Sequence, residues 1–183
     1  MTFIIGKLEF TPAANQPGLL AAPVAAALAD PAWWPRPAAD VGVCEIDPDL
    51  ADTAAFCERY AVSPAESANC VVIAGKREGE IRFAACVVLA TTRADVNGVA
   101  RRALDVRKAS FAAIDVAVAE TAMEYGGITP IGLPADWPVL IDQRVVGAGV
   151  VVIGSGVRRS KILLPGRLLA QLPTAEVIEG LAA

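Results

Sequence analysis

The chain carries, at residues 126–133, the stretch Gly126-Gly127-Ile128-Thr129-Pro130-Ile131-Gly132-Leu133, which is followed directly by Pro134. Glycine and proline at this density predict a rigid turn whose backbone amides lie open. Such a turn is suited to holding a carboxylate, an ester carbonyl or a phosphate. A helix C-cap followed by an ordinary tight loop would use the same residue types. Spacing alone therefore favours the ordinary loop.

The segments on either side of this stretch alternate between strand and helix patterns. Two apolar runs joined by the charged residues 75–80 indicate a β-hairpin, and Asp95 is a good N-cap for the helix that follows it. Strands separated by both hairpins and helices indicate a mixed sheet of the α/β or α+β class. The other expected elements are strands at 70–74, 81–91, 139–141, 149–153, 161–164 and 176–178 and helices at 114–124 and 166–172.

The first sixty residues are expected to form an extension ahead of a compact core at about 61–183, with residues 1–183 making one domain. This extension would shape the pocket or a subunit interface, which would allow a homodimer. Prolines and the pair Trp33-Trp34 predict a loop at 30–40, or an arm packed down by its tryptophans. The remaining predictions are strands at 3–10 and 41–46, a short helix up to Ala29, and a helix from Asp47-Pro48 whose apolar stripe is Leu50, Ala54, Cys57 and Ala61.

The composition is that of a soluble protein with one core. The chain has 183 residues, of which 55% are hydrophobic, and its mean hydropathy is +0.49. No apolar run approaches the roughly 18 to 20 residues that span a bilayer. The first ten residues lack a basic leader followed by a long hydrophobic block. We therefore expect a cytoplasmic protein that is not bound to a membrane.

Several kinds of chemistry are excluded by residue type. The chain has no histidine, and its four cysteines form no CxxC pair, so we expect no zinc site, no other metal and no Ser-His-Asp or Cys-His mechanism. No cofactor is expected either. The formal charge of −4 argues against general nucleic-acid binding. Basic residues at 101–108 and 158–161 could form local positive patches, although exposed positive faces are an equally good explanation.

The run at 126–133 resembles the GG(V/I)(S/T)PxG loop of the YbaK/EbsC family, which includes the editing domain of bacterial prolyl-tRNA synthetases. Further resemblances follow in the order of the family. They are Asp95 opening a helix, Arg107-Lys108-Ala109-Ser110-Phe111-Ala112, Pro138-Val139-Leu140-Ile141-Asp142, Val152-Ile153-Gly154-Ser155-Gly156, and Ile162-Leu163-Leu164-Pro165. The resemblance covers roughly residues 68–172 and implies a mixed, barrel-like sheet surrounded by helices.

This resemblance implies a hydrolase of translation fidelity, which cleaves in trans the ester that links a wrong, small amino acid to the 3′ end of tRNA. In the family, backbone amides of the loop hold the ester carbonyl, and the substrate's own ribose hydroxyl largely activates the water. The residues that match catalytic positions are Gly126 and Gly127 as amide donors, Asp142 at the pocket wall, and Asn69. The residues that match substrate-binding positions are Thr129, Pro130, Gly132, Gly154, Ser155 and Gly156.

One departure from the family concerns a lysine that usually opens the first strand of the motif. Here its position falls on Ala68 or Asn69. Asn69 can still donate hydrogen bonds, though without charge. The loss allows two alternatives to an editing enzyme: a non-catalytic protein that binds tRNA or a small ligand, and a protein-interaction domain in which the glycine turn is only a turn. Cys70 could line the same pocket, and Trp33-Trp34 could stack on the terminal adenine.

Overall fold

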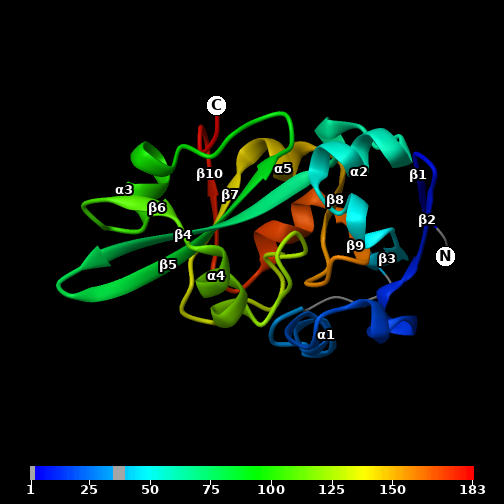
Figure 1. Ribbon diagram of the computed structural model, residues 1–183, viewed down its shortest axis with the longest axis horizontal. Coiled ribbons are helices and arrows are strands. Elements are labelled where there is room, and N and C mark those ends of the chain that lie inside the picture. Colours follow the sequence, from blue (N-terminus) through cyan, green and yellow to red (C-terminus); the bar gives the residue numbers. More distant parts are fainter. Residues whose placement is uncertain (1–2, 35–39) are drawn as a thin grey trace.

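The computed structural model describes residues 3–34 and 40–183, which form two five-stranded sheets covered by short helices (Figure 1). One sheet has the strand order β1-β2-β3-β9-β8 and the other has the order β10-β7-β5-β4-β6. Their strands are β1 (Phe3–Ile5), β2 (Leu8–Pro12), β3 (Gly42–Glu45), β8 (Val150–Gly154) and β9 (Ser160–Pro165), then β4 (Ala68–Arg77), β5 (Glu80–Leu89), β6 (Ala109–Phe111), β7 (Val139–Asp142) and β10 (Ala175–Ile178).

The two sheets meet where Ser67, just before β4, forms a parallel bridge with Val152 of β8. In the second sheet β7 pairs in parallel with both β5 and β10, whereas β4 pairs antiparallel with β5 and β6. The predicted mixed α/β architecture with a curled, barrel-like sheet is thus confirmed.

The helices are α1 (Ala22–Ala29), α2 (Thr53–Tyr60), α3 (Arg101–Ala103), α4 (Ile114–Thr121), α5 (Gln143–Gly147), the π-helix η6 (Val96–Ala100), and the 3-10 helices η1 (Ala13–Asn15), η2 (Pro17–Leu19), η4 (Pro48–Leu50), η5 (Pro64–Glu66) and η7 (Gly166–Gln171).

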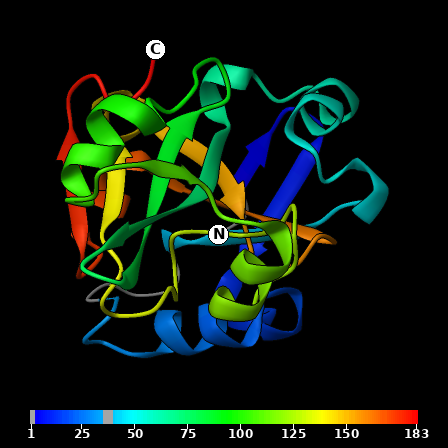
Figure 2. The same ribbon diagram turned by 60° about the vertical axis from the view of Figure 1, so that its left-hand side comes forward.

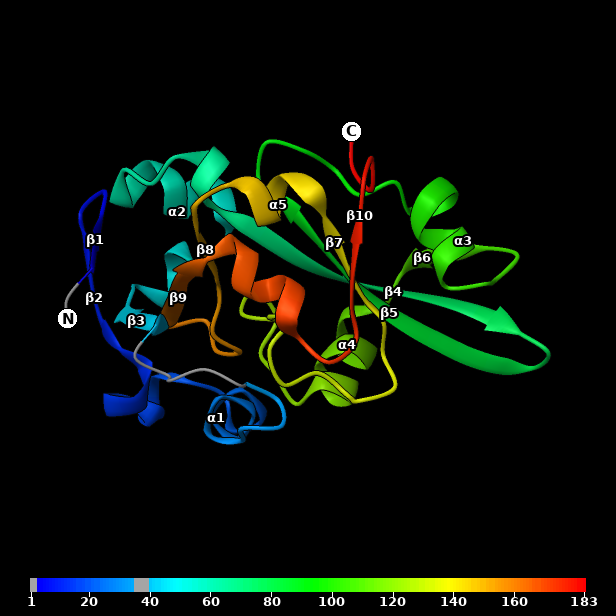
Figure 3. The same cartoon turned by 180° about the vertical axis from the view of Figure 1, so that it is seen from behind.

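The predicted hairpin is present as β4 and β5, which project beyond the rest of the molecule (Figures 1 and 3). The first strand is longer than predicted, because only Glu78 and Gly79 form the turn, whereas the second strand ends at Leu89, two residues earlier than predicted. Both have positive φ, 53° and 89°, which is the conformation that a tight two-residue hairpin requires. Asp95 caps the next helix as expected, since its carboxylate accepts hydrogen bonds from the N–H groups of Gly98 and Val99.

The predicted single strand at 3–10 is wrong, because the chain reverses at Gly6 and forms the hairpin of β1 and β2. Gly6 has a φ of +55°, and a Cβ there would lie 2.3 Å from the carbonyl oxygen of Tyr60. Glycine therefore permits both the turn and its close contact with the end of α2. The hairpin lies at the opposite end of the molecule from the hairpin of β4 and β5 (Figure 3).

The helix predicted from Asp47-Pro48 divides into the 3-10 helix η4 and the α-helix α2. The stripe that α2 buries is Phe56 and Cys57, whereas Ala54 is exposed. Ala61 is exposed as well, and it ends α2 in the left-handed conformation with a φ of 54°. The assignments of Ala54 and Ala61 to the core were therefore wrong, whereas that of Cys57 is confirmed. The spacing counted from Leu50 fails because the helix is interrupted between η4 and α2.

The helix before the glycine turn also ends earlier than predicted. Helix α4 stops at Thr121, and Ala122 takes the left-handed conformation with a φ of 53°. Gly126 and Gly127 therefore do not cap this helix, and they are free to form a separate turn. Figure 2 shows α4 on the same side of the sheets as α1.

The largest hydrophobic cluster draws buried residues from both sheets and from the N-terminal segment, including Val24 and Trp34. Trp34 is only 4% exposed and Trp33 is half-buried, so the packed-down arm is confirmed for these two residues. Residues 35–39 of the predicted loop at 30–40 lie outside the described residues. Within the described part of the chain, none of the helices has the length and apolar character needed to cross a membrane.

Candidate functional site

A cavity of about 370 Å³ lies where the two sheets meet. Its lining comes from the segment before α2, from β4, from the region between β6 and α4, from the glycine turn, and from β8 and β9. The lining residues that carry the argument below are Thr53, Asn69, Phe111, Gly126, Gly154 and Lys161.

The cavity runs along β4 and has two chemically different ends. At one end the Thr53 hydroxyl donates a hydrogen bond to the side-chain oxygen of Asn69. At the other end β6 pairs with β4, so that Phe111 lies opposite Ile73 and Ala112 N–H donates to the carbonyl oxygen of Val72 at 2.9 Å, and the side chains of Phe111 and Ile114 line the cavity. Asn69 and Val72 are three residues apart on one strand, and the rise of a strand therefore separates the two ends by about 10 Å. One end is polar, and the other is apolar.

The glycine turn is fixed to the loop between β8 and β9 by backbone hydrogen bonds. Gly156 N–H donates to Gly127 O at 2.7 Å, and Glu124 N–H donates to Gly156 O at 2.8 Å. The approach is close because Gly154 has no side chain: a Cβ there would lie 2.3 Å from Gly127 O and 2.7 Å from Ile128 O. Glycine at position 154 is therefore required for the turn to lie against β8.

The amides of the turn differ in what they can bind. Gly127 N–H already donates to Glu124 O at 2.9 Å, so it is not open as predicted. The amides of Gly126 and Ile128 donate to no other described residue, and both residues line the cavity. Gly126 has a φ of +83°, which favours glycine. The turn thus offers two free donors at the cavity, one predicted and one not.

Arg158 joins two segments that form the cavity wall. Its guanidinium donates to Pro48 O at 3.0 and 3.2 Å and to Tyr125 O at 3.1 Å. Its backbone N–H donates to the carboxylate of Glu124 at 2.6 Å. Arg158 therefore links the segment before α2 to the glycine turn, and one of the two predicted basic segments has a structural role.

Three of the predicted site residues line the cavity, namely Asn69, Gly126 and Gly154. The other predicted residues do not line the cavity. Ser155 is fully buried, and its hydroxyl is within 2.7 Å of the Ser160 hydroxyl and 3.0 Å from Ser160 O. Also absent from the lining are Gly127, Thr129, Pro130, Gly132 and Gly156.

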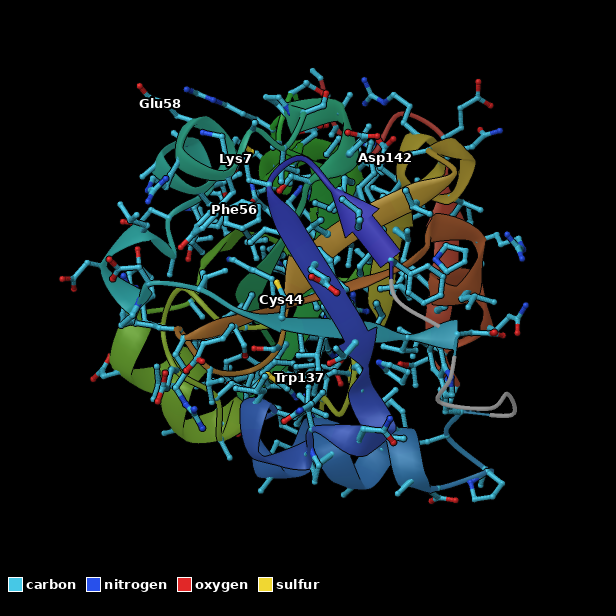
Figure 4. All side chains as sticks on the ribbon, turned by 90° about the vertical axis from the view of Figure 1, so that its right-hand side faces the viewer. Lys7, Cys44, Phe56, Glu58, Trp137 and Asp142 are labelled. Carbon is cyan, nitrogen blue, oxygen red and sulfur yellow. The ribbon has the colours of Figure 1, made fainter. Side chains whose placement is uncertain are left out.

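Asp142 does not lie in the cavity, contrary to its predicted place at the pocket wall. Its carboxylate caps α5, binds the Arg144 guanidinium at 2.8 and 3.0 Å, and accepts the Ala182 N–H at 3.0 Å. Figure 4 shows Asp142 beside α5, apart from Phe56 and Cys44. Burial alone would raise the pKa of this carboxyl, but the hydrogen bonds from Arg144 and Ala182 outweigh burial and lower it.

Sequence reasoning missed Lys161, which lines the cavity while being only 7% exposed. Its ammonium donates to Ala51 O at 2.9 Å and lies 5.2 Å from the centre of the Phe56 ring. Burial, and then the charge of Arg158, lower the pKa of Lys161 to about 8, although Asp52 opposes the shift. The signal in the sequence was a single lysine inside the otherwise apolar strand Ser160–Pro165.

Cys70 lines the cavity, but burial raises the pKa of its thiol strongly. A thiol that stays protonated is a poor nucleophile, so Cys70 acts as a small apolar wall residue. Within residues 3–34 and 40–183, no group of three or more His, Cys, Asp or Glu side chains is arranged to hold a metal ion.

The protein is thus of the α/β class, and its small cavity has a polar and an apolar end. The glycine turn lies at this cavity, and the amides of Gly126 and Ile128 have no hydrogen-bond acceptor among the described residues. Residues 47–172 match the family described as the aminoacyl-tRNA editing domain. The chain belongs to this family, which includes the YbaK proteins.

Two solved structures share the fold of this chain. One, described as a proposed trans-editing enzyme for prolyl tRNA synthetase, is 19% identical, with a TM-score of 0.65 over 76% of this chain and 85% of that one. Another, the hypothetical protein APE2540, is 18% identical, with a TM-score of 0.67 over 77% of this chain and 90% of that one. A comparison with curated proteins gave no match.

Proposed function

We propose that this protein hydrolyses, in trans, the ester bond between a small, mismatched amino acid and the 3′ end of tRNA. The observation that carries the proposal is the glycine turn, which brings the free amides of Gly126 and Ile128 to a cavity of about 370 Å³. This volume suits an aminoacyl group with part of the terminal ribose and excludes the folded body of a tRNA.

Hydrolysis requires that the negative charge of the reacting carbonyl oxygen be stabilised. Water adds to the ester carbonyl, and the amides of Gly126 and Ile128 donate to the oxygen that becomes an oxyanion. The bond to the ribose oxygen then breaks, and this oxygen takes up the proton lost by the water and becomes a hydroxyl. The products are the free amino acid and uncharged tRNA. The second ribose hydroxyl of the substrate helps to remove the proton of the water, because the chain has no histidine to act as base.

The terminal nucleoside would enter past the apolar end of the cavity. Phe111, Ile114 and Tyr125 line this cavity and are 61%, 54% and 53% exposed, which is unusual for large apolar side chains. Exposed aromatic rings stack readily on unpaired bases. Phe111 is therefore a better candidate for contact with the terminal adenine than Trp34, which is buried in the core.

The proposal is tested with one tRNA body charged in turn with alanine, serine, cysteine, threonine and the cognate amino acid. We expect catalytic release of at least one small mismatched amino acid, unaffected by a chelator and abolished when the terminal ribose lacks its free hydroxyl. Loss of turnover with a chelator and recovery with zinc would contradict this mechanism. Tight binding of charged tRNA without release would favour the non-catalytic alternative.

A further inference from the structure

The ammonium of Lys161 is a buried cation without a matching anion. No carboxylate of the described residues lies within 4.0 Å of it, although Asp52 attracts it from farther away. Its hydrogen-bond acceptor in the protein is Ala51 O, whereas an ammonium has three N–H donors. A buried charge with unused donors is unfavourable unless another group completes its hydrogen bonds.

This ammonium lies at the polar end of the cavity. It is 2.9 Å from Ala51 O, and residues 51–53 all line the cavity. Thr53 in turn donates to Asn69, which with Ala68 is one of the two positions that match the family's lysine. The cavity therefore receives no positive charge from β4, and β9 supplies one as the ammonium of Lys161.

The polar end is also the deeper one. Lys161 and Ser67 are 7% and 5% exposed, whereas Phe111 and Ile114 at the opposite end are more than half exposed. If the nucleoside lies at the open apolar end, the aminoacyl group reaches toward Lys161. This orientation rests on the proposed function.

We propose that Lys161 is a specificity-determining residue, which donates a hydrogen bond to an oxygen on the amino-acid side chain and so favours hydroxylated aminoacyl groups over apolar ones of the same size. The hydroxyl of a seryl or threonyl group accepts a second hydrogen bond from the ammonium, beside the one to Ala51 O. An alanyl or valyl group excludes water from the ammonium and offers no acceptor. Sites that hydrogen-bond a substrate hydroxyl reject the analogue that lacks it, because their own polar group is then left unpaired.

The test uses one tRNA body and compares its threonyl ester with its valyl ester, and its seryl ester with its alanyl ester. Three proteins are measured: the wild type, Lys161→Met and Lys76→Met. Lys76 is an exposed lysine near the tip of the hairpin of β4 and β5, so its variant controls for the loss of one positive charge. We expect the wild type to show a kcat/KM for the hydroxylated member about 10- to 100-fold higher. The preference should fall to about 3-fold or less in Lys161→Met and persist in Lys76→Met.

If Lys161 only held Ala51 O in place, Lys161→Met would lower both rates together and leave their ratio unchanged. An unchanged ratio, or a wild type that prefers the apolar member, overturns the inference. If Lys161→Met does not fold, the ratio of the two rates in the wild type decides the inference, because a wild type that prefers neither member overturns it.

A binding measurement separates this inference from the proposed function. Amide-linked seryl and alanyl analogues of 3′-amino-3′-deoxyadenosine cannot be hydrolysed as esters, and their affinities are measured by calorimetry. Preferential binding of the seryl analogue, lost in Lys161→Met, supports the inference even where the ester is not cleaved. Equal binding of the two analogues, or binding of neither, overturns it.

Discussion

The N–H of Gly156 donates a 2.7 Å hydrogen bond to the carbonyl oxygen of Gly127, and this contact holds the glycine turn against the end of β8. Gly154 makes the approach possible, because a Cβ at that position would lie 2.3 Å from the same oxygen. We predict that Gly154→Ala displaces the turn, lowers the free energy of unfolding by about 1–3 kcal/mol, and reduces aminoacyl ester hydrolysis at least 10-fold. Thermal unfolding and single-turnover hydrolysis measure the two effects.

Gly147→Ala is the matched control for this variant. A Cβ at Gly147 meets no atom within 4 Å, and the residue is exposed in α5. The same substitution there should leave activity unchanged and stabilise the helix by up to about 1 kcal/mol. If Gly154→Ala behaved like this control, the turn would not depend on contact with β8.

Asp142 stabilises the fold from outside the cavity. Asp142→Ala removes the acceptor of Ala182 N–H and of the Arg144 guanidinium, and it should lower the free energy of unfolding by about 1–3 kcal/mol. Because the pKa of Asp142 is lowered, its contribution should be present above its ordinary value of 3.8 and be lost as the pH falls below it. Urea unfolding from pH 3 to 7 checks both points. Hydrolysis per folded molecule should not change, and a fall in it would place Asp142 in the mechanism.

A second cation in the cavity would compete with Lys161. Asn69→Lys puts an ammonium on the wall that Lys161 already lines, and it also removes the acceptor of the Thr53 hydroxyl. Like charges with little access to water repel, so the variant should lower the melting temperature by several degrees. In the Lys161→Met background, Asn69→Lys should lower the melting temperature by clearly less. A double-mutant cycle without coupling between the two sites would mean that their ammonium groups do not meet.

Because of Lys161, the free energy of unfolding should vary with pH in the alkaline range. The pKa of this lysine is lowered from 10.5 to about 8, so between these values the unfolded chain holds a proton that the folded protein has lost. Stability due to this group therefore rises with pH across that window, by about 3 kcal/mol in total. Buried thiols act in the opposite direction above pH 9, since the pKa values of Cys44 and Cys86 are raised to about 12.

Subtracting the unfolding free energy of Lys161→Met from that of the wild type cancels the contribution of Cys86. The contributions of Cys44 and Cys57 cancel in part, because the charge of Lys161 lowers the pKa values of both thiols. The difference should increase as the pH rises from 8 to 10.5 and stay level between pH 6 and 7. A difference that is flat over the whole range would show that the Lys161 ammonium is as well solvated in the folded protein as in the unfolded chain.

Sequence patterns located most strands and the glycine turn, because these depend on local alternation and on residues with special backbone freedom. They failed where distant contacts decide the outcome. Nothing near Asp142 in the sequence shows that the N–H of Ala182 binds its carboxylate, and the short strand Ala109–Phe111 exists because β4 offers it an edge. Lys161 escaped notice because burial of its ammonium depends on residues that are about a hundred positions earlier in the chain.

The two ends of the cavity are carried by one continuous strand, β4, rather than by two independent loops. Their separation is consequently a property of the peptide backbone, and no substitution at either end can lengthen or shorten it. Relatives could exchange the group at Asn69 without changing the distance from this end of the cavity to the end at Phe111. The strand thereby fixes how far apart two parts of one bound ligand lie, whatever side chains contact them.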